Sequence, residues 1–420
     1  MVNNVLGSPN SKAVPALQNG RRIAVSPADA ASLSYTLIPT VPRNMVALID
    51  DLYIRFTGTV AANTTYTLTL TANSQNLKFV ARTDALANTT HNYDIHPKGS
   101  LMVLAGSTLA VTASAANQWM LQCEYRLVSQ WEAMTGGYMP GIPFMASLVD
   151  PGTAVATDVI TAATVTKLRG IDLRGLTITG YQNNAAAGAS KEIMLEFYDG
   201  TTSRKIIKNC YGTTALNNQK PLIISQCRIR GPRNAAPFTA NSYGIRATFG
   251  GIVAGDAAVN VWGFYYTDTQ HTSSGTGVPA ASATAASDLG DQFWFYSEAV
   301  ATGITEWYPS TTLGSGQRPI VIEGYSISMA GNTGDATTAA LSKSDGTSIS
   351  LGVIFSGSLG TVAGAITSVY EGQNILVSTG DRPSFGIVNI LGTIDKCGMT
   401  VWGRVGGPGR SFADTIRTGA

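Results

Sequence analysis

The residues of this chain with the clearest potential for chemistry are two histidines that flank an aspartate. His91 and His96 lie on either side of Asp94, and imidazole and carboxylate groups are common zinc ligands. Their spacing places the two imidazoles on opposite faces of an extended segment, and no cysteine or third histidine lies nearby in the sequence. We therefore expect polar residues at a strand end and no metal site. The remaining histidine, His271, lies in a segment rich in Ser, Thr, Ala and Gly.

Motifs of known enzyme classes are absent from the sequence. It contains no nucleophile elbow, Walker loop, paired-carboxylate motif or Gly-rich dinucleotide turn. Gly250-Gly251 and the run 406–409 precede no helical pattern, so neither predicts a phosphate cradle. No pair among the 26 acidic residues is singled out for glycoside hydrolysis. We expect no enzyme activity, no catalytic residue and no cofactor.

The cysteines and the glycosylation patterns also lack a clear chemical role. None of the cysteines forms a C-x-x-C pair, and their low density does not predict a disulfide framework. They are Cys123, Cys210, Cys227 and Cys397. Cys123 alternates in phase with Trp119, Leu121 and Tyr125, which predicts a small apolar side chain facing a core. Asn63 and Asn88 match the glycosylation pattern, but without a secretory signal we expect ordinary turn residues.

Composition indicates a chain of short strands. Hydrophobic residues make up 44% of the sequence, whereas charged residues make up 13%, well below the ~25% of an ordinary soluble domain. The 45 glycines and the Thr-rich runs have the spacing of strands joined by tight turns. Long stretches with helical periodicity are absent. The fold class is therefore predicted to be all-β, with room for about two to four domains in 420 residues.

Charge argues against nucleic acid and membrane as partners. The chain has 28 basic and 26 acidic residues, a net charge of +2, so no field of one sign attracts nucleic acid. Basic residues near the ends are scattered single charges. They are Lys12, Arg21, Arg22, Arg404, Arg410 and Arg417. No run of ~18 apolar residues predicts a membrane-spanning helix, and the N-terminus lacks the pattern of a secretory signal.

One pattern occurs three times along the chain. In residues 47–56, 171–178 and 320–327, apolar residues alternate with period two, slip by one position, and then resume. Alternation indicates a strand with one buried face, and a one-residue slip must be absorbed as a β-bulge. The slips fall at Asp50-Asp51, Arg174-Gly175 and Glu323-Gly324. We infer three copies of one domain plan.

Two further landmarks recur at matching distances. Asp199-Gly200-Thr201 and Asp345-Gly346-Thr347 predict hairpin turns, and Asn73-Ser74 takes that place in the first copy. Strands ending in Val-Trp-Gly close the second and third copies at 261–263 and 401–403, and residues 119–125 close the first. We expect the tryptophans of these strands to pack in a core beneath a sheet.

These landmarks predict three tandem antiparallel β-sandwich domains. Each has room for about seven to nine strands, as in a jelly roll or an immunoglobulin-like domain. The late hairpins, and the lack of a Cys…Trp…Cys pattern, favour the jelly roll, and three copies in one chain suit a pseudo-threefold arrangement. The expected boundaries are an N-terminal arm (1–22), first sandwich (23–128), linker (129–147), second sandwich (148–268), linker (269–296), third sandwich (297–406) and C-terminal tail (407–420).

Residues 99–116 carry a resemblance to a known class of proteins. A strand, the turn Ala105-Gly106, and a Thr-rich strand leading into the last strand resemble the closing hairpin of jelly-roll virion proteins. The likeness is to the cement, or decoration, proteins of tailed bacteriophages in particular, which are similarly rich in Ala, Thr and Gly. The resemblance implies clamping of a shell protein and no catalytic residues. The chain departs from the common form by holding three domains.

The sequence favours a structural role and leaves three functions open. The first is a capsid cement protein of a virion, made in the host cytoplasm, with the major capsid protein and copies of itself as partners. The second is a jelly-roll major capsid protein that forms the shell itself. The third is a host-glycan-binding adhesin or a tail receptor-binding protein, which needs an exposed aromatic platform. Its candidate residues are Tyr265, Tyr266, Trp294 and Phe295.

Overall fold

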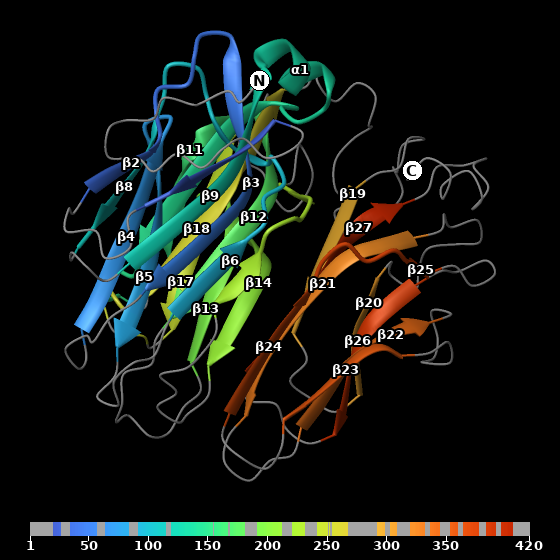
Figure 1. Ribbon diagram of the computed structural model, residues 1–420. Helices are drawn as coiled ribbons and strands as arrows, with labels where there is room; N and C mark the ends of the chain where they lie inside the picture. Colours follow the sequence, from blue (N-terminus) through green and yellow to red (C-terminus); the bar gives the residue numbers. More distant parts are fainter. Residues whose placement is uncertain are drawn as a thin grey trace.

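The computed structural model consists almost entirely of antiparallel β-strands (Figure 1). It describes residues 20–26, 34–56, 64–83, 91–114, 119–153, 155–166, 169–180, 191–211, 221–231, 242–250, 252, 254–267, 292–298, 303–308, 320–331, 337–344, 353–359, 364–377, 384–391 and 396–405. Among these residues no helix is both long enough and apolar enough to span a bilayer.

The first domain is a sandwich of two sheets. Its strands are β1 (Arg21–Val25), β2 (Ser34–Ile38), β3 (Met45–Phe56), β4 (Thr64–Ala72), β5 (Gln75–Thr83), β6 (His91–Ile95), β7 (Leu101–Val103), β8 (Leu109–Ala113) and β9 (Trp119–Ser129). One sheet has the order β1-β9-β3-β6, with β7 also paired to β3, and we call it the front sheet. The other has the order β2-β8-β4-β5, and we call it the back sheet.

The second domain repeats this plan. Its strands are β10 (Ile142–Val149), β11 (Thr157–Thr166), β12 (Arg169–Gly180), β13 (Lys191–Tyr198), β14 (Ser203–Tyr211), β15 (Leu222–Ile224), β16 (Ile229–Arg230), β17 (Ser242–Gly250) and β18 (Ala257–Thr267). The front sheet has the order β10-β18-β12-β15, with β16 on β12, and the back sheet has the order β11-β17-β13-β14.

The third domain repeats it again. Its strands are β19 (Gln292–Ser297), β20 (Gly303–Tyr308), β21 (Ile320–Gly331), β22 (Thr337–Ser344), β23 (Val353–Leu359), β24 (Gly364–Tyr370), β25 (Ile375–Val377), β26 (Ser384–Leu391) and β27 (Lys396–Val405). The front sheet has the order β19-β27-β21-β24, with β25 on β21, and the back sheet has the order β20-β26-β22-β23.

This common strand order is that of a jelly roll. In each domain the front sheet joins the first, last and third strands, and the back sheet ends on the fifth strand as an edge. Two facing antiparallel sheets connected in this way form a double Greek key. The predicted all-β class and the tandem sandwiches are therefore confirmed, and the strand order, which the sequence left open, is now defined.

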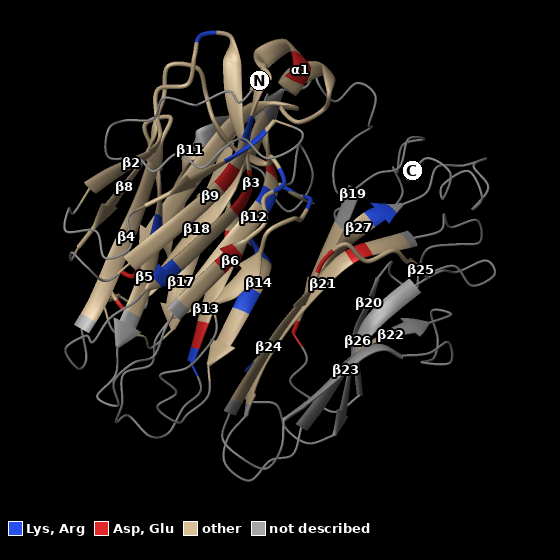
Figure 2. Ribbon diagram, viewed as in Figure 1, with Lys and Arg blue, Asp and Glu red and all other residues tan. Residues whose placement is uncertain are grey.

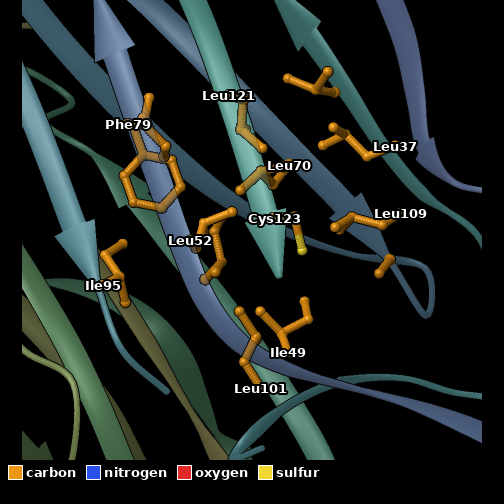
Figure 3. Close-up of a cluster of buried hydrophobic side chains, with 14 of the residues drawn as sticks. Leu37, Ile49, Leu52, Leu70, Phe79, Ile95, Leu101, Leu109, Leu121 and Cys123 are labelled. Atoms are coloured by element: carbon orange, nitrogen blue, oxygen red, sulfur yellow. The ribbon is translucent and has the colours of Figure 1, made fainter. Parts of the chain in front are cut away.

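The core of each sandwich consists of the side chains that alternate inward from its two sheets. Figure 3 shows the core of the first domain, where residues of β3, β5 and β9 converge from opposite sheets. Phe79 and Leu121 are buried there, and Cys123 lies among them as a small apolar residue, as its phase predicted. Tyr93 adds a polar tie inside this core by donating a hydrogen bond to the carbonyl of Val80.

All three predicted bulges are present. The register of the third strand against the last strand shifts between Ile49 and Asp51, between Leu173 and Gly175, and between Ile322 and Gly324. Each shift absorbs the extra residue that the slip in alternation requires, so inward residues remain inward on both sides of it. The threefold recurrence in the sequence thus corresponds to one structural feature.

The predicted hairpins are also present. Asn73 and Ser74 both have positive φ (53° and 60°), as a two-residue type I′ turn between β4 and β5 demands. Between β13 and β14, Gly200 has φ +103°, and Oδ1 of Asp199 accepts hydrogen bonds from the backbone N–H groups of Thr201 and Thr202. Strands β22 and β23 also pair as a hairpin, although its turn residues 345–347 lie outside the described residues.

The domain boundaries differ from those expected. Strand β1 begins at Arg21, inside the expected arm 1–22, and β10 occupies 142–149, inside the expected linker 129–147. Strand β10 contains Pro143, which is tolerated there because β10 lies at the edge of its sheet. Strand β19 likewise begins at Gln292, within the expected linker 269–296. Alternation did not predict this strand, because the adjacent residues Trp294 and Phe295 are both buried.

The segment between β9 and β10 contains a short helix. Helix α1 (Gln130–Thr135) follows β9 directly, and Oγ of Ser129 accepts a hydrogen bond from the backbone N–H of Glu132 at 3.0 Å. The spacing Ser-x-x-Glu is the sequence signature of such a helix start.

The expected closing hairpin in residues 99–116 is wrong. Strand β7 pairs with β3 in the front sheet, whereas β8 pairs with β2 and β4 in the back sheet. The turn at Ala105-Gly106, with Gly106 at φ +78°, therefore carries the chain across the sandwich between the two sheets. Local turn chemistry cannot distinguish such a crossing from a hairpin, because both need one residue with positive φ.

The three domains are arranged in series, from the blue first domain to the orange and red third domain (Figure 1). The edge strand β5 of the first back sheet packs against β10 and β18 of the second front sheet. The edge strand β14 of the second back sheet packs in the same way against β21, β24 and β27 of the third front sheet. The extended sheet contacts that join the domains thus run from first to second and from second to third.

Candidate functional site

The two joints between domains are the most elaborate polar and apolar sites of the described chain. At the first joint, the side-chain amide of Asn260 on β18 lies against the outward edge of β5. Its Oδ1 accepts a hydrogen bond from the backbone N–H of Lys78 at 2.6 Å, and its Nδ2 donates to the carbonyl of Lys78 at 2.8 Å. A second donation, to Oγ1 of Thr177, orients the amide. One side chain thus replaces the missing neighbour strand of β5.

At the second joint, hydroxyl side chains form hydrogen bonds with the outward groups of the edge strand β14. Oγ1 of Thr400 on β27 donates to the carbonyl of Ile206 at 2.8 Å, and Oγ of Ser328 on β21 accepts from the backbone N–H of Cys210 at 2.7 Å. Oγ1 of Thr367 donates to Oδ1 of Asn209 at 2.8 Å. The outward backbone groups of the edge strand β14 are therefore paired in a buried environment, where unpaired groups would be costly.

A tryptophan opposite a glycine fills the apolar part of each joint. Gly175 pairs across the front sheet with Trp262, and Gly324 pairs with Trp402, immediately after the bulge in each case. A Cβ atom at Gly175 would lie 2.1 Å from Cζ2 of Trp262, and one at Gly324 would lie 2.3 Å from Cζ2 of Trp402. The missing side chain creates the space in which the indole lies flat on the sheet.

These tryptophans belong to the joints and not to the cores of their own sandwiches. Trp262 packs with the core residues of the first domain, and its indole N–H donates to Oγ of Ser100 at 3.2 Å. Trp402 packs with the core residues of the second domain. The predicted burial beneath a sheet is confirmed, although the sequence did not indicate which domain supplies the core. Trp119, which closes the first domain, does lie in its own core, as predicted.

A buried ion cluster adds to the second joint. Lys208 of β14 is 93% buried at its side chain, and its Nζ lies 2.8 Å from Glu192 and 2.8 Å from Glu298, which follows β19. Burial acts to raise the pKa of Glu298, but hydrogen bonds from Lys208 and Lys205 outweigh it and hold the pKa at about 2. Burial acts in turn to lower the pKa of Lys208, and its two carboxylate partners raise it above the ordinary value.

The outer face of the first front sheet is equivalent to these joint faces but carries charged residues. Asp51 pairs directly with Glu124 across the strands, at the positions held by glycine and tryptophan in the other domains. Oδ1 of Asp51 lies 2.7 Å from Nδ1 of His96 and 2.6 Å from Nζ of Lys98. Burial acts to raise the pKa of Asp51, but these two hydrogen bonds lower it below its ordinary value. In Figure 2, blue and red segments gather along β3 and β9, whereas β2, β4 and β8 are mainly tan.

A cavity of about 330 Å³ lies where the three domains meet. Its walls include the residues that follow the sixth strand of each domain, in the segments 97–100, 226–228 and 372–374. Hydrogen bonds tie these segments together, from the backbone N–H of His96 to Oγ of Ser225 and from that of Gln226 to Oε1 of Glu371. Three equivalent segments thus meet at one point, as a threefold-like arrangement requires, although the sheet contacts run in series.

The charges of this cavity are largely matched within the chain. Lys98 pairs with Asp51, and Arg174 pairs with Asp172 at 2.8 Å. Burial lowers the pKa of Arg228, and the neighbouring Arg174 lowers it further. Burial raises the pKa of Glu371 despite its backbone hydrogen bonds. The arrangement serves as a polar junction that holds the three domains together.

The histidine cluster considered first is not brought together. His96 pairs with Asp51, and Asp94 pairs with Arg55 on β3, so the two residues serve different partners. His91 begins β6, but its side chain lies outside the described residues, as does the whole of His271. Within the part of the chain that the structure describes, no group of three or more His, Cys, Asp or Glu residues is placed to hold a metal ion.

The described members of the candidate aromatic platform do not form an exposed surface. Trp294 and Phe295 are buried, and the indole N–H of Trp294 donates to the carbonyl of Arg230 at 2.8 Å. Tyr265 is half-buried and stacks on Phe144 with ring centroids 4.6 Å apart. The side chain of Tyr266 lies outside the described residues, as do Asn63 and Asn88.

Sequence comparison gives no relatives, because no protein-family profile and no curated protein matches the chain. Among solved structures, the chain is similar to the STIV MCP at 12% identity and a TM-score of 0.29, covering 60% of this chain and 99% of that one. It is also similar to the CBM22-1-CBM22-2 tandem domain of Paenibacillus barcinonensis Xyn10C, at 12% identity and a TM-score of 0.18, covering 62% of this chain and 93% of that one. A chain of the T13 IBDV viral particle is a further match, at 9% identity and a TM-score of 0.11, covering 88% of this chain and 77% of that one.

Two of these three structures are of viral capsid proteins. The likenesses are of fold.

Proposed function

We propose that the chain is a virion structural protein, and that it acts as a capsid cement protein that binds a preformed shell through protein–protein contacts. The observation that carries this proposal is the joint between domains, in which one sheet edge is covered by the outer face of another sheet. The chain uses this joint twice, with different residues in the same places. Because the same contact geometry forms with two different sets of side chains, we expect that it can also form between this chain and another protein.

The joints have the chemistry of durable protein interfaces. Each combines a buried tryptophan with hydrogen bonds to backbone groups, and the second adds a buried ion cluster. Aromatic anchors within well-packed, water-excluded contacts carry most of the energy of such interfaces. Trp294 and Phe295, two of the candidate residues for a glycan platform, are buried, which supports a structural role over glycan binding by these residues.

Sedimentation and electron microscopy of the purified chain test this proposal, alone and after mixing with shells from the particles of its source. A cement protein stays small alone and adds to preformed shells. Closure into shells by the chain alone would instead identify a major capsid protein. Binding to cells or to a glycan array, with no binding to shells, would identify an adhesin and overturn the proposal.

A further inference from the structure

Among the described residues, the series of joints leaves the edge of β23 and part of the first front sheet without a sheet partner. Strands β5 and β14 are each covered by the next front sheet, but β23, the equivalent edge strand of the third domain, is the last in the series. Among the described residues, β23 forms ladder hydrogen bonds with β22 alone. An uncovered edge of this kind exposes a row of backbone N–H and C=O groups ready to pair.

The first front sheet is the corresponding face. Around Val46, Leu48 and Met102 it is covered by helix α1 and Phe264, and no sheet edge of the described residues packs against the remaining part, around Gln122 and Glu124. The chemistry of this remaining part differs from that of the covered faces. At the second domain the face presents Asn260 and Trp262, and at the third it presents Thr400 and Trp402, all uncharged. The aligned registers place Gln122 where those faces have Asn260 and Thr400. The same registers place Glu124 in the position of the tryptophans and Asp51 in that of the glycines.

Charged side chains make this part of the face a poor partner for a sheet edge. Covering it would remove Glu124 from water, together with the half-exposed His96 and Lys98 that pair with the buried Asp51. Removing charged groups from water is strongly unfavourable. Repeat proteins commonly end in such a polar outer face, which keeps the series from growing.

From these observations we infer that the edge of β23 binds an uncharged sheet face of another protein, and that Asp51 and Glu124 exclude a second copy of this chain as that partner. The face of the partner presents amide or hydroxyl side chains for the outward backbone groups of β23, with a tryptophan lying on a glycine beside them. This inference rests on the proposed function, because it names the surface through which the chain would contact a shell.

The double variant Asp51→Gly/Glu124→Trp tests both halves of the inference. It recreates on the first front sheet the glycine–tryptophan pair of the other two faces, while Gln122 remains in place to bind the edge. The expected result is head-to-tail association, seen in sedimentation as masses that are multiples of one chain and that grow with concentration. The unchanged protein is expected to remain a single chain under the same conditions.

The wild-type protein also provides the matched control. Its β23 edge can bind the altered face of the variant, but its own charged face cannot be extended, so adding it should shorten the assemblies. A folded double variant that stays a single chain would overturn the role of β23. Head-to-tail association of the wild-type protein would overturn the role of Asp51 and Glu124.

Hydrogen exchange of the wild-type protein tests the open edge without any variant. Backbone amides of β23 should exchange much faster than those of the covered edges β5 and β14. Equal protection of all three strands would overturn the inference even if the double variant fails to fold. Neither experiment involves a shell, so a failure of shell binding would count against the proposed function alone.

Discussion

At the residue scale, the joints depend on glycines whose missing side chain is filled by a neighbour. Gly175 and Gly324 are required because an indole occupies the place of their Cβ atoms. In the first domain the equivalent position is Asp51, which contacts His96 and Lys98 instead of an indole. The residue type at each bulge therefore depends on the side chains that contact it on the outer face of the sheet.

Gly175→Ala should destabilise the chain, because its methyl group would lie within van der Waals overlap of Trp262. Overpacking of this kind costs about 1–3 kcal/mol. Urea unfolding followed by tryptophan fluorescence measures the change in the free energy of unfolding. In the double variant Gly175→Ala/Trp262→Ala the methyl group should cost much less than it does alone. Additive effects of the two substitutions would contradict the contact.

The cysteines give a second test at this scale. All four are free and buried, and burial raises the pKa of the thiols of Cys123, Cys210 and Cys227. A thiol that is both buried and protonated is a poor nucleophile. The native protein should therefore react with none of its thiols in an Ellman assay, and all four should react in denaturant. Rapid reaction of a native thiol would show that one of these cores opens.

At the element scale, the sequence predicted what each strand does within its own sandwich. The three bulges, the turn at Asn73-Ser74 and the inward phase of Cys123 were predictable because alternation and turn chemistry are local. Periodicity says which residues face the core but not what covers the opposite face. The roles of Asn260 and Trp262 at the first joint were therefore beyond sequence reasoning, although the pairing of tryptophan strands with glycine bulges in two of the three copies was a visible signal.

Asn260→Ala should loosen the joint at β5. The variant leaves the backbone N–H and C=O of Lys78 without the partner that now covers them, at a cost of about 1–3 kcal/mol. Hydrogen exchange should show faster exchange of the Lys78 amide, with little change in the strands of the third domain. Asn92→Ala, at an exposed position on β6, is the control and should leave the exchange of β5 unchanged. Unchanged protection of Lys78 in Asn260→Ala would refute this role.

At the scale of the whole molecule, the domains are coupled by charge as well as by sheet packing. The pKa of Glu298 is about 2 in the folded chain, below its ordinary value of 4.5, because Lys208 and Lys205 outweigh the effect of burial. A lowered carboxyl pKa contributes stability that is present above pH 4.5 and is lost as the pH falls toward 2. Protonation of Glu298 at low pH should therefore weaken the joint between the second and third domains, because Glu298 then loses its charge interaction with Lys208 and Lys205.

Glu298→Gln isolates that contribution. The variant should be less stable than the wild-type protein at neutral pH, because Lys208 then lies buried with one carboxylate partner instead of two. The difference in unfolding free energy should shrink as the pH falls from 4.5 toward 2, since the wild-type side chain becomes neutral as well. Glu371, whose pKa is raised by burial, acts in the opposite direction, but it is present in both proteins and cancels in the difference. Urea unfolding at several pH values, followed by the fluorescence of the joint tryptophans, measures this difference, with exposed Glu132→Gln as the control. A difference that stays constant with pH would show that Glu298 does not couple the two domains through its charge.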